Sequence, residues 1–293
     1  ILPDFNAIIQ LKKSESIRFN YAMRTQFTDV SKIAQGLVLN NYNSIFSGDN
    51  EIQNAISHSF NLNYFSFNLF NYTNIFARIS YNKSIGQIRN LTTFESVVAS
   101  SSPFNSPFAD ENFSANGRFQ RQFGKIRASL SSRINFSKFN QYISDINNPS
   151  ISENFSQTYG ATVRTSFKEA PNVELGYNYS LSNNTLGNVE SRFYTKAPFI
   201  DVDALILKSF TFRSRYTNTS FSNDRAVLNE YEFWDASLAY KKDQDSKWEF
   251  ELKATNLLNT KSQNQSNTGN ISISSTEYFI QPRFITFRLV YDL

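Results

Sequence analysis

Cysteine is absent from the 293-residue sequence, and histidine occurs only once, as His58. The lack of cysteine excludes disulfide bonds, thiolate metal sites and cysteine nucleophiles. The single imidazole excludes any site that needs two histidines. Glycine is scarce, with 9 residues, and no glycine-rich phosphate-binding loop is present. We therefore expect neither a metal nor another cofactor.

Long runs of charge and long hydrophobic runs are also missing. Net charge is +4, and the Lys and Arg residues are scattered, which disfavours a nucleic-acid-binding stripe. The longest uncharged stretch, 59–77, has roughly the length of a membrane-spanning helix. It carries Asn or Ser every few residues, so a helix there would bury many unpaired amides in lipid. A helical membrane span is therefore excluded.

Aromatic residues are abundant instead, with 29 Phe and 15 Tyr making up most of a 16% aromatic content. They alternate with Asn, Ser, Arg and Lys in segment after segment. In 17–23 the apolar set is Ile17, Phe19, Tyr21 and Met23, and in 285–293 it is Ile285, Phe287, Leu289, Tyr291 and Leu293. A period of two indicates β-strands with one apolar and one wet face.

The connections between these segments predict an up-and-down meander. Short connections are expected at 12–15, 121–125, 168–172 and 241–246. Long polar connections, rich in Asn, Ser, Gly and Pro, are expected at 28–54, 88–111, 138–153, 182–190, 221–229 and 259–277. Alternating lengths place all tight turns at one end of the sheet. The pattern predicts about thirteen strands.

A meander of this length exposes a continuous apolar face unless a second layer or a lipid bilayer covers it. No amphipathic helix in the sequence supplies a second layer. We therefore expect an all-β, antiparallel up-and-down transmembrane β-barrel with apolar residues toward lipid. The polar alternates would line the lumen: Arg18, Asn20, Arg78, Arg127, Arg133, Arg164, Glu249, Glu251 and Lys253. The alternative is a soluble β-sandwich or solenoid, whose core would favour Val, Ile and Leu over Phe and Tyr.

The stretch 248–261, "WEFELKATNLLNTK", gives the clearest single membrane crossing. Trp248, Phe250, Leu252 and Ala254 alternate before the adjacent pair Leu257 and Leu258. Ten steps from Trp248 to Leu258 span about 33 Å, or about 25 Å of height at a tilt of about 40°. We expect Trp248 at the tight-turn interface and a bulge or bend at the Leu–Leu pair.

The segment 234–261 resembles the penultimate hairpin of TonB-dependent outer-membrane receptors. In that family an "N-L-[LF]-[ND]" motif closes the strand before the last long loop, and here it reads Asn256, Leu257, Leu258 and Asn259. The segment 277–293 resembles the final strand of the large receptors of the Bacteroidota. The passage 45–64 is similar to a "GNP-x-L" loop-to-strand passage of that subgroup, although "GDNEI" lacks its proline.

The resemblance implies a bacterial outer-membrane receptor for active nutrient uptake, with no enzymatic activity. A full barrel of that family has about 22 strands. Residues 1–293, with about thirteen strands, would therefore be a single transmembrane region that forms the C-terminal portion of such a barrel. The plug domain, the TonB box and the first strands would lie outside this chain. The implied partners are outer-membrane lipid, the plug domain, the TonB/ExbB/ExbD energy complex and the barrel-assembly machinery. That machinery would read Phe287, Leu289, Tyr291 and Leu293, although the family usually ends in Phe or Trp.

Other functions and sites remain open at this stage. The strands could instead close as a barrel of about fourteen strands, acting as a porin or as a structural component of a secretion or surface assembly. An enzymatic barrel would need His58 as its general base. His58, however, alternates in phase with Ile56, Phe60 and Leu62 and so faces the apolar side of the strand, which favours a histidine at the membrane interface without a catalytic role. In the loop 94–110, Phe104 and Phe108 would contact a ligand or a surface lipoprotein, or else pack against neighbouring loops.

Overall fold

A computed structural model describes residues 2–95, 97–142, 150–168, 171–243, 245–268 and 273–291. The fold is all-β, dominated by one antiparallel sheet of 13 strands in up-and-down order. The expected strand number is confirmed. The strands of this sheet, in spatial order, are β1 (Asp4–Lys12), β2 (Glu15–Gln26), β5 (Ala55–Asn68), β6 (Thr73–Ile85), β9 (Asp110–Phe123), β10 (Ile126–Gln141), β11 (Ser150–Thr165), β12 (Asn172–Leu186), β13 (Val189–Ile206), β14 (Phe210–Asn223), β15 (Val227–Lys241), β16 (Trp248–Thr255) and β19 (Phe284–Tyr291).

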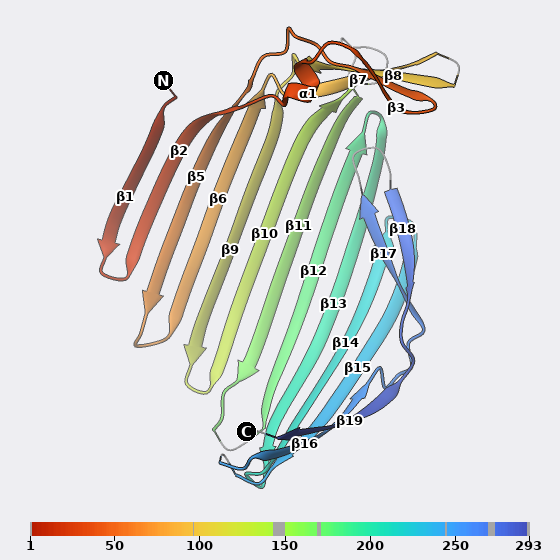
Figure 1. The fold of residues 1–293 in the computed structure, drawn as a ribbon. Helices are drawn as coiled ribbons and strands as arrows, with labels where there is room; N and C mark the ends of the chain where they lie inside the picture. The colour runs from red at the N-terminus through yellow and green to blue at the C-terminus, as the bar shows by residue number, and fades with distance from the viewer. Residues whose placement is uncertain are drawn as a thin grey trace.

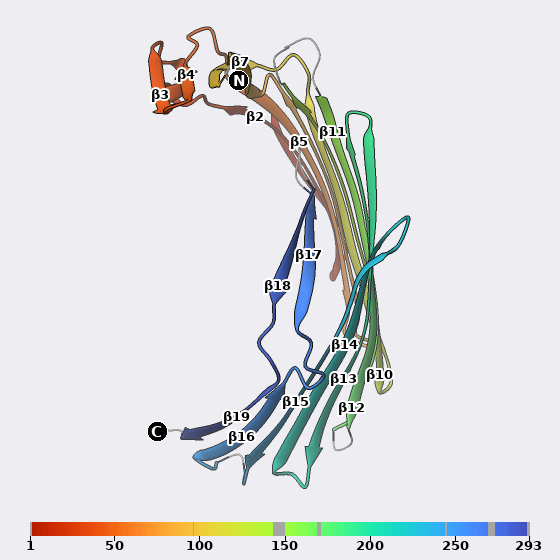
Figure 2. The ribbon, with the colours of Figure 1, turned by 90° about the vertical axis from the view of Figure 1, so that its right-hand side faces the viewer.

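The sheet is a single curved layer with a convex and a concave face (Figures 1 and 2). Side chains alternate between these faces because successive residues of a strand point to opposite sides. Within the described strands, β1 pairs only with β2 and β19 only with β16, so the sheet has two open edges. The described strands therefore do not close on themselves as the fourteen-strand alternative requires.

Connection lengths agree with the sequence pattern at one end of the sheet and differ at the other. At the tight-turn end the strands are joined by short segments such as 13–14, 69–72, 124–125 and 207–209. At the opposite end two connections expected to be long are short, 187–188 and 224–226. Gly187, with φ +57°, makes the first of these turns, and the flanking polar residues belong to β12 and β13. Polar composition alone could not separate a loop from a polar strand end.

Two of the long connections, 27–54 and 86–109, form a second, four-stranded sheet, which we call the loop sheet. It contains β3 (Leu37–Asn41), β4 (Ser44–Ser47), β8 (Val98–Asn105) and β7 (Ile88–Glu95), in that spatial order. A short helix, α1 (Val30–Ile33), precedes it, capped by the Asp29 carboxylate, which accepts a hydrogen bond from the Ser31 N–H at 2.9 Å. That bond lowers the pKa of Asp29. The loop sheet projects to the concave side (Figure 2).

Side-chain contacts fasten the loop sheet to the large sheet. The amide of Asn105 donates to the carbonyls of Gln53 and Gly86 at 2.8 and 2.7 Å, and so joins the two long connections. Arg89 on β7 forms an ion pair with Asp110, the first residue of β9. The buried hydroxyl of Tyr142 lies 2.6 Å from the Ser106 hydroxyl. These contacts hold the loop sheet in place at the long-connection end.

A hydrophobic core of the kind found in soluble domains is nearly absent from the described residues. Their buried apolar side chains are only Ala22, Ala55, Pro103, Tyr142, Phe199 and Ala204. The hairpin of β17 (Ser262–Thr268) and β18 (Ile273–Phe279) forms a separate two-stranded sheet on the concave side (Figure 2). No helix in the described part of the chain is long and apolar enough to cross a membrane.

Candidate functional site: the two faces of the large sheet

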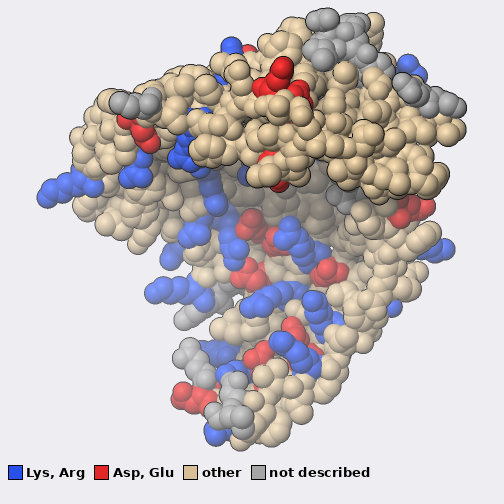
Figure 3. Space-filling model, turned by 45° about the horizontal axis from the view of Figure 1, so that its top comes forward, with Lys and Arg blue, Asp and Glu red and all other residues tan. Residues whose placement is uncertain are grey.

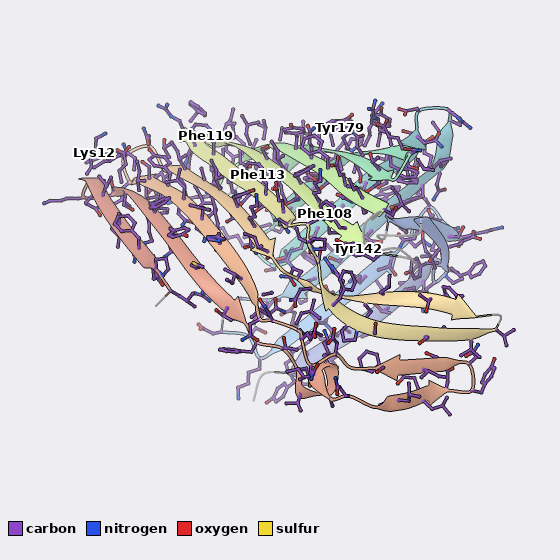
Figure 4. All side chains as sticks on the ribbon, turned by 90° about the horizontal axis from the view of Figure 1, so that it is seen from above. Lys12, Phe108, Phe113, Phe119, Tyr142 and Tyr179 are labelled. Atoms are coloured by element: carbon purple, nitrogen blue, oxygen red, sulfur yellow. The ribbon has the colours of Figure 1, made fainter. Side chains whose placement is uncertain are left out.

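The convex face carries large apolar side chains that are exposed in the described part of the chain. Leu130, Leu175, Leu252 and Phe287 are 57%, 53%, 50% and 68% exposed, although each lies on a strand of the large sheet. Figure 4 shows Phe119 and Tyr179 pointing outward from this face. An apolar surface of this extent requires a partner or a lipid phase.

An aromatic row crosses the convex face on six adjacent strands. The strand register pairs Tyr21 with Phe60, Phe60 with Tyr81, Tyr81 with Phe113, Phe113 with Phe136, and Phe136 with Phe155. Ring centroids of Tyr21 and Phe60 are 4.7 Å apart, and those of Phe60 and Tyr81 are 6.2 Å apart. The first three rings therefore lie side by side, and the other three continue the row in register.

The next row of the same face, toward the long-connection end, is charged. It contains His58, Lys83, Glu111, Lys138 and Glu153, again as direct register partners. Lys83 pairs with Glu111 at 3.6 Å and Lys138 with Glu153 at 2.9 Å. The charged row therefore interrupts the apolar surface of these strands, which resumes at Ile56, Ile85 and Ile151.

His58 lies in this charged row, on the apolar side of β5, where the sequence parity predicted it. Its Nδ1 is 3.0 Å from the Tyr21 hydroxyl, and its register partners are Met23 and Lys83. Neither a carboxylate nor a serine hydroxyl bonds the ring in the described residues, whereas a Ser–His–Asp site requires both. The described residues also contain no group of three His, Asp or Glu side chains that could hold a metal ion.

The concave face is mostly polar, with a few aromatic side chains such as Phe65 and Phe76. Figure 3 shows Lys, Arg, Asp and Glu side chains gathered in the hollow. The polar alternates predicted from the sequence lie on this face, because each is out of phase with the apolar residues of its strand: Arg18, Asn20, Arg78, Arg127, Arg133, Arg164, Glu249, Glu251 and Lys253.

Opposite charges are paired in the C-terminal half of the concave face. Arg164 contacts Glu174 at 3.2 Å and Asp203 at 2.7 Å, and Arg215 lies 3.5 Å from Asp201. Arg288 pairs with Glu251 at 3.0 Å. A polar depression of about 520 Å³ follows these residues along β13, β14 and β15. Charge on this half of the wall is therefore largely neutralised within the wall.

The N-terminal half of the concave face is arranged differently. There the register aligns Arg18, Asn63, Arg78, Asn116 and Arg133 in one row across β2, β5, β6, β9 and β10. We call this set the arginine row. The Arg78 guanidinium donates to the Ser80 hydroxyl at 3.3 Å and to the Asn61 amide oxygen at 3.4 Å. Sequence analysis found the three arginines but not their alignment, since register is not visible in single strands.

The motif Asn256–Asn259 forms the turn that ends β16. Strand alternation from Trp248 is confirmed as far as Thr255, where β16 ends, and the bend expected at Leu257–Leu258 is confirmed, since both residues lie in a turn. Asn256 and Asn259 adopt left-handed φ values of +51° and +57°, which asparagine tolerates better than most residues. This conformation ends the ladder of β16 at Thr255.

The buried Asn256 side chain fixes this turn through three hydrogen bonds. Its amide donates to the Thr260 carbonyl at 2.8 Å and the Gln281 carbonyl at 3.0 Å, while its oxygen accepts from the Thr260 N–H at 2.8 Å. The Asn256 N–H donates to the Asp235 carboxylate at 2.8 Å. The motif therefore joins the end of β16 to β15 and to the segment leading into β19.

The final strand and the loop aromatics complete the predicted site residues. Phe287, Leu289 and Tyr291 share the convex face of β19, and Tyr291 packs on Trp248 with ring centroids 4.6 Å apart. Leu293 lies outside the described residues.

The two loop phenylalanines differ in exposure. Phe104 is half-buried, with its ring edge-on to Tyr142 at 4.8 Å, as the loop-packing alternative requires. Phe108 is 42% exposed, beside Tyr142 (Figure 4).

A scan against protein-family models finds no match for this chain. A search of curated proteins finds no match either. The functional argument therefore depends on the geometry of the two faces and on the sequence motifs.

Proposed function

We propose that this chain forms the wall of an outer-membrane β-barrel belonging to a TonB-dependent receptor that takes up a nutrient actively. One observation carries the proposal: a single-layered sheet has an exposed apolar convex face and a polar concave face. In a bilayer this arrangement places apolar side chains in lipid, polar ones in the lumen, and pairs the backbone groups between strands.

The distribution of aromatic residues supports a membrane setting. Aromatic girdles flank the apolar band of outer-membrane barrels. Here the row Tyr21–Phe60–Tyr81–Phe113–Phe136–Phe155 lies next to the charged row, and the Trp248 ring packs at a tilt against Tyr291 at the tight-turn end. Because strands of barrels tilt, such a row crosses the band obliquely rather than level.

The receptor identity depends on the motif at Asn256–Asn259 and on the final strand. In the proposed mechanism a plug domain blocks the lumen. TonB transmits force from the ExbB/ExbD complex to the plug domain, and this force rearranges the plug. The barrel-assembly machinery would recognise the convex residues of β19. This chain performs no covalent chemistry in that mechanism, and its wall guides the solute.

The loop sheet supports a partner at the outer surface. Leu37, Leu39 and Tyr42 are 79%, 68% and 92% exposed, at the end where the long connections gather. Exposed apolar residues of this kind mark a docking surface. A surface lipoprotein covering the mouth of the barrel is the partner consistent with this position.

Membrane insertion is tested with the purified chain and liposomes of phosphatidylcholine. We expect the chain to co-float with the liposomes and to resist extraction at alkaline pH. A chain that stays soluble without detergent and binds no lipid would overturn the assignment of the convex face.

The receptor is distinguished from a porin or a structural barrel by the coding sequence upstream of Ile1. A plug-like domain there supports the receptor, whereas a signal peptide directly before Ile1 excludes it. Replacing His58 with Ala should leave any lipase or protease activity of the preparation unchanged, because no catalytic partner bonds its ring. A loss of such activity would favour an enzymatic barrel.

A further inference from the structure

We infer that the arginine row (Arg18, Asn63, Arg78, Asn116 and Arg133) binds a small solute that carries several anionic groups, such as carboxylates or phosphates. This inference deepens the proposed function and depends on it, because it assigns the chemical class of solute that the lumen wall accepts. Membrane pores select anions and phosphates with Arg and Lys side chains arranged around the pore wall.

The register sets the spacing of the row. Arg18, Arg78 and Arg133 lie on every second strand, with Asn63 and Asn116 on the strands between. Adjacent strands are about 4.8 Å apart, so consecutive arginines are about 9.6 Å apart along the wall. Each guanidinium offers several N–H donors in one plane. Each intervening asparagine adds an NH2 donor group and an oxygen acceptor.

The charge of the row is not neutralised within the wall. None of the three arginines forms an ion pair in the described part of the chain. The neighbouring concave positions are neutral or cationic: Asn20, Asn61, Ser80, Ser114 and Asn135 in the row above, and Ser16, Phe65, Phe76, Arg118 and Ser131 in the row below.

The other half of the same wall provides an internal comparison. There Arg164, Arg215 and Arg288 each contact a carboxylate within 3.5 Å. A wall that needed only a hydrated lining could pair its arginines in the same way on both halves. Like charges repeated without counter-charges repel one another. The unpaired row therefore suits an anionic group supplied from outside the wall.

Exposure and position make the row accessible to a solute. All three arginine side chains are exposed and lie on the concave face by their register, and Figure 3 shows charged side chains of both signs in its hollow. Arg guanidinium is more weakly hydrated than Lys ammonium and binds carboxylate and phosphate in a bidentate manner. Successive anionic groups of one solute could engage successive arginines.

The test measures binding of tripolyphosphate to the purified chain in a neutral detergent by isothermal titration calorimetry, with neutral maltoheptaose as the reference solute. We expect tripolyphosphate to bind and the binding to weaken as ionic strength rises. The variant R18Q/R78Q/R133Q should bind at least about tenfold more weakly, since charge-assisted hydrogen bonds are lost.

A charge-matched control removes the same number of cations from the connections, as K13Q/K208Q/R225Q. Its affinity should stay within about twofold of the parent, because these residues lie outside the concave wall. Equal weakening in both variants, or no binding by the parent chain, would overturn the inference. Circular dichroism and the shift of mobility on heating verify that both variants fold.

Two further outcomes separate this inference from the proposed function. Binding of a glutamate-rich peptide without binding of tripolyphosphate would assign the row to a polypeptide and overturn the small-solute inference. Co-flotation with liposomes does not depend on the arginine row. The liposome test of membrane insertion is therefore independent of the result of the binding test.

Discussion

At the scale of single residues, local backbone chemistry decides where strands end and which side chains can approach. Asn256 and Asn259 end β16 because both occupy left-handed conformations. Gly176 leaves the space in which the Phe199 ring lies across the concave face, and the Arg215 guanidinium stacks 5.1 Å from that ring centroid. Each feature depends on the residue type at one position. Asparagine tolerates the positive φ at the end of β16, and glycine leaves room for the Phe199 ring.

Replacing Asn256 with Ala should destabilise the chain by about 2–4 kcal/mol, because three side-chain hydrogen bonds are lost at a buried turn with positive φ. Asn256→Gly tolerates the φ value and should cost less than Asn256→Ala. Urea unfolding in lipid vesicles measures both variants. Equal stability of parent and Asn256→Ala would show that the turn does not depend on this amide.

Gly176→Ala should cost about 1–3 kcal/mol, because a Cβ at this position overlaps the Phe199 ring and forces it to move. Gly117→Ala is the matched control, since its Cβ would have no atom closer than 3.7 Å. Tryptophan fluorescence during urea unfolding reports both stabilities. Equal losses in the two variants would mean that the close contact with Phe199 is not responsible.

At the scale of strands, period-two patterning separates the sheet into two chemically different faces. On β15, Leu238 points to the convex face and lies between Phe212 and Leu252 in the register, whereas Ser237 points to the concave face between Arg213 and Lys253. Adjacent residues of one strand therefore meet entirely different surroundings.

Leu238→Arg should destabilise the inserted protein by about 2–4 kcal/mol, the cost of an arginine at the midplane on a lipid-facing strand. Ser237→Asn is the control, because it places a polar residue in a polar row one position away. Folding into vesicles, followed by the shift of electrophoretic mobility on heating, measures both. A neutral Leu238→Arg result would place the convex face outside lipid.

At the scale of the whole molecule, the open edges and the loop sheet define what the chain needs from its surroundings. Interior strands such as β10 and β11 have a partner on each side, while β1 and β19 have one partner each within the described residues. Exposed edges of a sheet offer unpaired backbone groups to further strands.

Hydrogen exchange should therefore be much slower in β10 and β11 than in β1 and β19. Every amide of an interior strand is hydrogen-bonded to one of its two neighbouring strands, whereas edge amides that face outward have no partner strand. Mass spectrometry of exchanged peptides from the chain in detergent measures the difference. Equal protection at β1 and β10 would indicate that another strand covers the β1 edge.

The sequence by itself determined the strands of the large sheet, their faces and the tight turns, because side-chain alternation and turn residues act over a few positions. It did not predict the strands of the loop sheet or β17 and β18, which lie in segments expected to be connections. It could not distinguish the polar ends of β12 and β14 from loops. Only the tertiary structure decided which residues share a row. Arg18 and Arg133 meet in one row through a register built up across four strand pairs, each fixed by the lengths of the intervening connections. The paired charges of β11–β14 and the unpaired arginines of β2–β10 look alike as single alternating strands, and they differ only in what the neighbouring strand places beside them.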